Sequence, residues 1–77
     1  MMTVDELFAN ENQVNSFADL VSEVVGVRHG VTELRVVFQT LPSWVQITAL
    51  ADGMDNQQFK EDALEVLVLI HEMTCGA

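Results

Sequence analysis

The chain has 77 residues, 49% of them hydrophobic, and its twelve acidic side chains stand against three basic ones, for a formal net charge of −9 at pH 7. This balance disfavours direct binding to nucleic acid or to an anionic membrane, because few basic side chains can displace counterions. A chain of this length buries only about 60–65% of its unfolded surface, so we expect one small domain over residues 1–77.

The cysteine content and the N-terminal residues indicate where in the cell the protein resides. The single cysteine, Cys75, excludes an intramolecular disulfide and a zinc site built on cysteine pairs. Residues 1–6 contain neither the basic region nor the apolar run of a signal peptide. We therefore expect a cytoplasmic protein.

Two helix-start signals occupy the N-terminal third. Thr3 and Glu6 have the spacing of a capping box and predict a short helical turn. Asn10 is a second N-cap candidate, before an expected helix over residues 11–25 that Gly26 would end. The apolar side chains on one face of this helix are Val14, Phe17, Val21, Val24 and Val25.

In the middle of the chain, apolar side chains recur at every second position, as in the strands of a β-hairpin. We expect one strand over residues 34–39 and a return strand over residues 44–51, joined by turn residues that include Pro42. In the first strand, one face carries Leu34, Val36 and Phe38; in the second, one face carries Val45, Ile47, Ala49 and Ala51. We expect Trp44 to close the core; if it faced outward it would be an anchor for a partner.

The best-specified helix is expected over residues 55–74. Asp55 is placed as its N-cap, Gln58 would complete a capping box, and Met54 and Phe59 would form a hydrophobic staple. Gly76 suits the left-handed position that follows a helix. The core-facing side chains are Phe59, Ala63, Val66, Leu67, Ile70 and Met73. Further residues widen this apolar stripe beyond what one core contact needs: Leu64, Val68, Leu69, His71 and Cys75.

These elements predict an α+β fold in the order helix, strand, strand, helix (αββα), with a two-stranded antiparallel sheet packed by two helices. A two-stranded hairpin is barely stable alone, and its exposed edges would pair. Edge-to-edge pairing in a homodimer would extend the sheet to four strands. The wide apolar stripe also indicates a homodimer, with an interface formed by Leu64, Val68, Leu69 and His71.

One short segment has metal-ligand spacing. His71, Glu72 and Cys75 resemble in outline the His-Glu-x-x-His zinc arrangement. That chemistry would need two or three ligands, an open coordination position and Glu72 as base, and only two ligands are visible. The other imidazole, His29, lies in an expected loop. We therefore expect no metal, no cofactor and no catalytic site, and interpret the chain as non-enzymatic.

Acidic side chains follow both expected helices in rows. Residues four apart on a helix stand about 6 Å apart, close to the phosphate spacing along one nucleic-acid strand. Such rows could imitate a phosphate backbone and occupy a basic groove on another protein; the alternative is a solvated helix face. The residues predicted to bind a partner are Glu61, Glu65, Glu72, Asp62, Asp19 and Glu23.

The sequence is best interpreted as a small acidic homodimer that binds, and inhibits or regulates, a basic nucleic-acid-processing protein. Its size and acidity resemble, in type, those of small phage-encoded inhibitors. The alternative is a structural or assembly subunit that uses its C-terminal helix as an oligomer interface, with a charge that only confers solubility.

Overall fold

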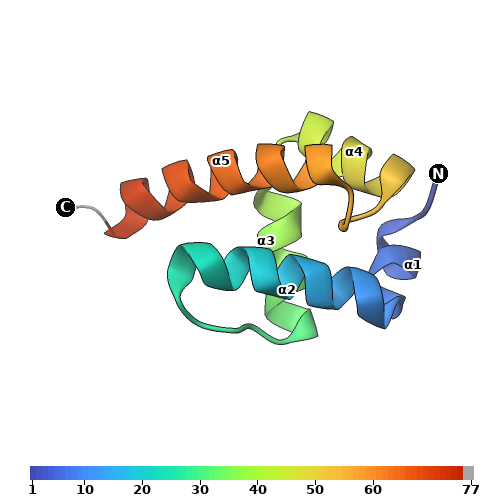
Figure 1. The fold of residues 1–77 in the computed structure, drawn as a ribbon, viewed down its shortest axis with the longest axis horizontal. Coiled ribbons are helices and arrows are strands. Elements are labelled where there is room, and N and C mark those ends of the chain that lie inside the picture. Colours follow the sequence, from blue (N-terminus) through green and yellow to red (C-terminus); the bar gives the residue numbers. More distant parts are fainter. Residues whose placement is uncertain (76–77) are drawn as a thin grey trace.

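The computed structural model describes residues 1–75, with side chains for residues 1–74, and over this range it contains helices and no strand. The helices are α1 (Val4–Ala9), α2 (Glu11–Val25), α3 (Val31–Thr40), α4 (Ser43–Asp52) and α5 (Gln57–Cys75) (Figure 1). The expected α+β fold is therefore wrong, and with it the strands over residues 34–39 and 44–51 and the four-stranded sheet of a dimer.

The two N-terminal helices begin as predicted. Thr3 and Glu6 form a reciprocal capping box, with both hydrogen bonds 3.1 Å long. The Asn10 side chain accepts hydrogen bonds from two backbone N–H groups of the first turn of α2. Asn10 is itself extended, so α1 and α2 are separate helices. The prediction that α2 covers residues 11–25 and ends at a left-handed Gly26, with φ of 78°, is confirmed.

Residues 31–40 form a helix because their buried side chains follow a helical period. Leu34 and Phe38, one turn apart, are fully buried, and Leu41 follows three residues later in the same core. Val36, which strand periodicity placed beside them, is 57% exposed. At the start of α3, the backbone N–H of Gly30 donates to Glu33 Oε2 over 2.8 Å.

The second predicted strand is also a helix, α4, because its buried side chains follow a helical period. Val45 and Ala49, four residues apart, are fully buried, whereas Ile47 between them is 51% exposed. The turn around Pro42 lies where it was predicted, but it joins two helices. Trp44 is 58% exposed, so the prediction that it closes the core is wrong.

Helix α5 begins two residues later than predicted. The side chain of Asn56 accepts the backbone N–H of Phe59 over 3.1 Å and so caps the first turn in place of Asp55. Gln58 donates to Asp62 over 3.0 Å and makes no capping box. Met54 and Phe59 are both fully buried in the core. The predicted role of Gly76 lies outside the described residues.

All five helices of the described range contribute to one hydrophobic core. The four phenylalanines of the chain meet at its centre: the rings of Phe8, Phe17 and Phe38 are mutually edge-on at 5.5–6.3 Å between centroids, and Phe59 packs beside them. Edge-to-face pairs stabilise a core beyond the area that they bury. Around this centre α2 and α5 lie side by side, with α3 crossing behind them (Figure 1).

Candidate protein-interaction surface

The outward face of α5 carries a shallow groove, here called the α5 groove. Its side chains follow three- and four-residue steps along one face of the helix: Glu61, Leu64, Glu65, Val68, Leu69 and Glu72. The three glutamates are exposed, Val68 is 37% exposed and Leu69 is 54% exposed. Predicted partner-binding residues and predicted oligomer residues therefore share one surface.

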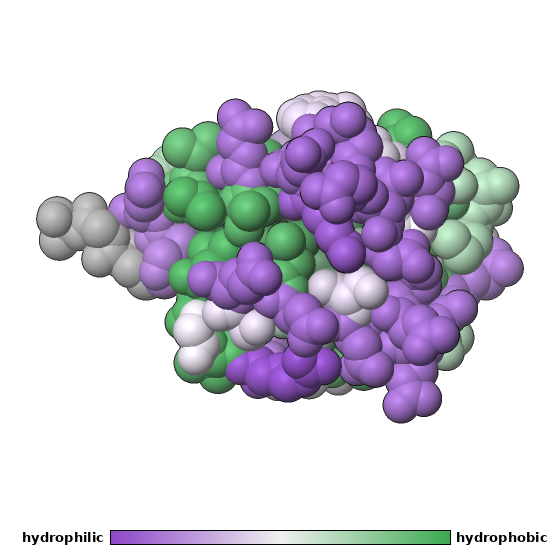
Figure 2. All heavy atoms as spheres, in the orientation of Figure 1, coloured by the Kyte–Doolittle hydropathy of each residue, from purple (hydrophilic) through white to green (hydrophobic). Residues whose placement is uncertain are grey.

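This groove exists because α5 is apolar on more than the face that it buries. Phe59, Ala63 and Leu67 pack into the core, which leaves Val68 and Leu69 on a different side of the helix. Figure 2 shows apolar side chains gathered over the C-terminal part of α5 and the neighbouring end of α2, while the opposite half of this face is mostly hydrophilic, with apolar groups at its edge. Sequence periodicity correctly predicted that apolar side chains such as Leu69 lie outside the core face of this helix. The prediction that Met73 faces the core is wrong, because this side chain is 84% exposed.

A second groove, here called the α2–α5 groove, adjoins the first. It brings Asp19 and Glu23 of α2 to the same surface as Glu61 of α5, and it shares Glu61 and Leu64 with the α5 groove. Its full lining is Ser16, Asp19, Leu20, Glu23, Gln57, Lys60, Glu61 and Leu64. Of the six acidic residues predicted to bind a partner, Asp62 lines neither groove. Its carboxylate accepts a hydrogen bond from the Gln58 side chain instead.

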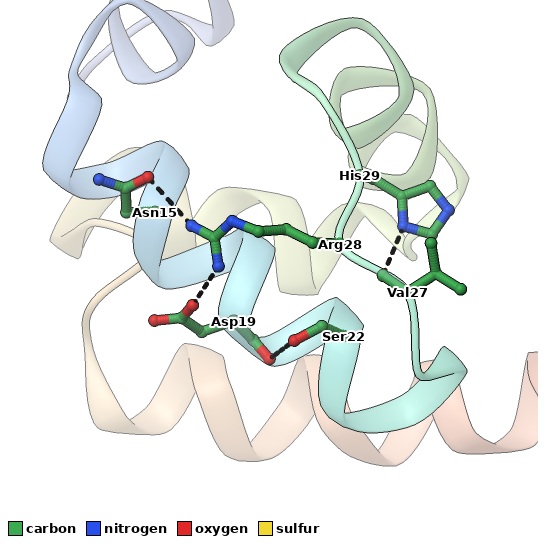
Figure 3. A network of polar contacts seen from close by, with 6 residues as sticks. All are labelled: Asn15, Asp19, Ser22, Val27, Arg28 and His29. Carbon is green, nitrogen blue, oxygen red and sulfur yellow. Dashed lines mark hydrogen bonds and ion pairs between the residues drawn. The ribbon is translucent and has the colours of Figure 1, made fainter.

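Asp19 has a structural partner. Arg28, in the loop between α2 and α3, reaches back along α2 and donates to Asp19 Oδ1 over 2.6 Å and to Asn15 Oδ1 over 3.2 Å (Figure 3). The Asp19 carboxylate is thereby partly neutralised and serves to fix the loop. Sequence reasoning missed this contact, since nothing in the loop sequence indicates in which direction Arg28 extends.

Most of the acidic charge has no such partner. The ion pairs among residues 1–74 are Arg28 with Asp19 and Arg35 with Asp5. Both pairs are exposed, and neither lies in the α5 groove. Within the described part of the chain, the three glutamates of that groove are not in an ion pair, so their charge is available to another molecule.

Comparisons of the chain with protein-family models, curated sequences and solved structures find no match. Among the described residues, no helix is long and apolar enough to cross a membrane.

The two histidines lie on another surface. His29 and His71 both line an apolar pocket of about 260 Å³ between α2, α3 and α5, so His71 is separate from the other predicted oligomer residues, Leu64, Val68 and Leu69. Sequence reasoning did not predict that the two histidines line one pocket, because this depends on how the helices pack together. The described side chains contain no group of three His, Cys, Asp or Glu placed to hold a metal ion. Cys75, which shares the metal-ligand spacing noted in the sequence, has no described side chain.

Proposed function

We propose that the protein is a non-enzymatic cytoplasmic interaction protein that binds a basic protein partner and inhibits or regulates it. The observation that supports this proposal is the α5 groove, where glutamates without ion-pair partners alternate with exposed apolar side chains. In protein interfaces, apolar anchors supply most of the affinity, while complementary charge speeds association and sets orientation. This groove offers both on a single helix.

Nucleic-acid-processing proteins are the partner class that fits the charge best. Their binding surfaces are basic and face phosphates, and carboxylates one helical turn apart, such as those of Glu61 and Glu65, stand at a comparable spacing of about 6 Å. A molecule with net charge −9 approaches such a surface by electrostatic steering. Occupation of the surface would block access to nucleic acid, which is the proposed inhibition.

The test is a pull-down from nuclease-treated lysate with the tagged protein at low and at high salt. We expect a basic protein that is retained at low salt and released at high salt, and we expect Glu61→Lys/Glu65→Lys to lose it. Each Glu→Lys exchange removes one negative charge and adds one positive charge, so the net charge of this variant rises from −9 to −5.

Asp52→Lys/Asp55→Lys is the matched control. It changes the net charge equally, at exposed positions outside both grooves. This control should retain the partner. Unchanged binding by Glu61→Lys/Glu65→Lys would contradict the proposal, and equal loss in both variants would show that only net charge matters.

A second candidate is an assembly subunit, which the apolar end of α5 favours: Leu69 is 54% exposed and Met73 is 84% exposed. The homodimer belongs to this candidate. Strand edges no longer support it, and pairing through the α5 groove would bring glutamates of two copies together, at a cost in free energy. Sedimentation of the purified protein discriminates the two candidates, because an assembly subunit forms a stable oligomer without any partner.

A further inference from the structure

Leu64, Val68 and Leu69 form an apolar strip in the lining of the α5 groove. No strand edge is present in residues 1–75 onto which a partner segment could add by backbone pairing. Buried backbone N–H and C=O groups need hydrogen-bond partners, and apolar side chains offer none. An α-helix satisfies its backbone internally and can therefore cover this strip without leaving buried N–H or C=O groups unpaired.

The border of the strip determines the charge of that segment. Glu61, Glu65 and Glu72 line the groove beside the apolar residues and have no ion-pair partner in the described chain. Lysine or arginine side chains flanking an apolar stripe would pair with them. An acidic segment, an anionic bilayer and the same face of a second copy would all be repelled, because each places negative charge against these glutamates.

The length of the groove determines the length of the segment. At a rise of about 1.5 Å per residue, Glu61 and Glu72 are separated by about 16 Å along α5, or about three helical turns. We infer that the partner segment bound in the α5 groove is a basic amphipathic helix of about three turns, with apolar residues at three- and four-residue spacing. This inference rests on the proposed function, since it assumes a basic partner.

The test uses three synthetic peptides of about 14 residues, labelled for fluorescence anisotropy: about three helical turns plus short flanks, because shorter helices are marginal in water. The first places leucines at helical spacing among lysines, the second has the same composition in strict alternation, and the third is the first with glutamate in place of lysine. We expect the first to bind at least about tenfold more tightly than the second, with an increase in helical circular dichroism, and the third not to bind.

Two exchanges on the protein locate the binding site. Val68→Gln/Leu69→Gln replaces exposed side chains of the groove, and Val36→Gln/Ile47→Gln replaces similarly exposed side chains outside it. The first variant should bind the helical peptide about tenfold or more weakly than the unchanged protein does. The second variant should bind it with unchanged affinity.

Equal binding of the helical and alternating peptides, or an equal effect of the two variants, would overturn the inference and leave the proposed function standing. Absence of binding to all three peptides, beside a basic partner in the pull-down, would do the same. A failure of the Glu61→Lys/Glu65→Lys experiment would instead remove the proposed function itself.

Discussion

Gly53 occupies a backbone conformation that is essentially restricted to glycine, with φ of 96° and ψ of 160°. The residue is buried where α4 ends, and a Cβ built on it would lie 2.8 Å from Asp55 Oδ1 and 2.9 Å from Gln13 Oε1. The same Gln13 oxygen accepts the backbone N–H of Met54. Gly53 therefore lets the first half of α2 hold the connection between α4 and α5.

Gly53→Ala should lower the free energy of unfolding more than Gly26→Ala does. Gly26 has φ of 78° but open space around a Cβ, so alanine there meets only the left-handed penalty of about 1–2 kcal/mol. At Gly53 steric overlap adds to backbone strain, and we expect about 1–3 kcal/mol more. Urea unfolding followed by circular dichroism measures both variants, and equal losses would show that Gln13 and Asp55 simply move away.

At the scale of elements, capping and periodicity together predicted α2 completely. Periodicity alone predicted most of α5, whose first turn is capped by Asn56 and not by Asp55. The segment that forms α3 satisfies two templates at once. Leu34, Val36 and Phe38 alternate like a strand, while Leu34, Phe38 and Leu41 have helical spacing and are the residues that are buried. The capping glutamate Glu33 favours the helix. Burial in the tertiary structure decides between the two patterns, because both fit the same residues.

The candidate surface was predictable in its residues but not in its arrangement. Helical spacing predicted that Glu61 and Glu65 share a face, because that relation is local to one helix. Which side of α5 faces α2 depends on packing, and this packing brings Glu23 beside Glu61 while it leaves Asp62 and His71 outside the α5 groove. Relations between elements are not encoded in the period of either element.

Two alanine exchanges distinguish the helical pattern of burial in α3 from the strand pattern. Leu34→Ala removes a fully buried side chain and should lower the free energy of unfolding by about 2–5 kcal/mol. Val36→Ala removes a side chain that is 57% exposed and should change it by about 0.5 kcal/mol or less. Chemical denaturation of both variants provides the measurement. Comparable losses would indicate that the two residues share a buried face, as a strand requires.

For the whole molecule, the important quantity is the distance over which its excess negative charges repel one another. The chain carries −9 within extents of 38 × 23 × 18 Å, and two exposed ion pairs are formed among its described residues. The Debye length is about 30 Å at 0.01 M salt and about 8 Å at 0.15 M. At low salt each carboxylate is therefore repelled by most of the others, whereas at physiological salt it interacts mainly with its neighbours.

Added salt should consequently stabilise the folded protein. Screening weakens the repulsion between carboxylates and also weakens the two exposed ion pairs, but such pairs contribute only about 0–1 kcal/mol each. Repulsion across the molecule outweighs them, so we expect the free energy of unfolding to rise by about 1 kcal/mol between 0.01 and 0.15 M sodium chloride. Urea titrations at the two concentrations measure this change, and choline chloride should reproduce it because screening does not depend on the cation. Glu61→Lys/Glu65→Lys, with its smaller net charge, should show a smaller rise. A decrease with salt would mean that the ion pairs of Arg28 and Arg35 contribute more to stability than the repulsion costs.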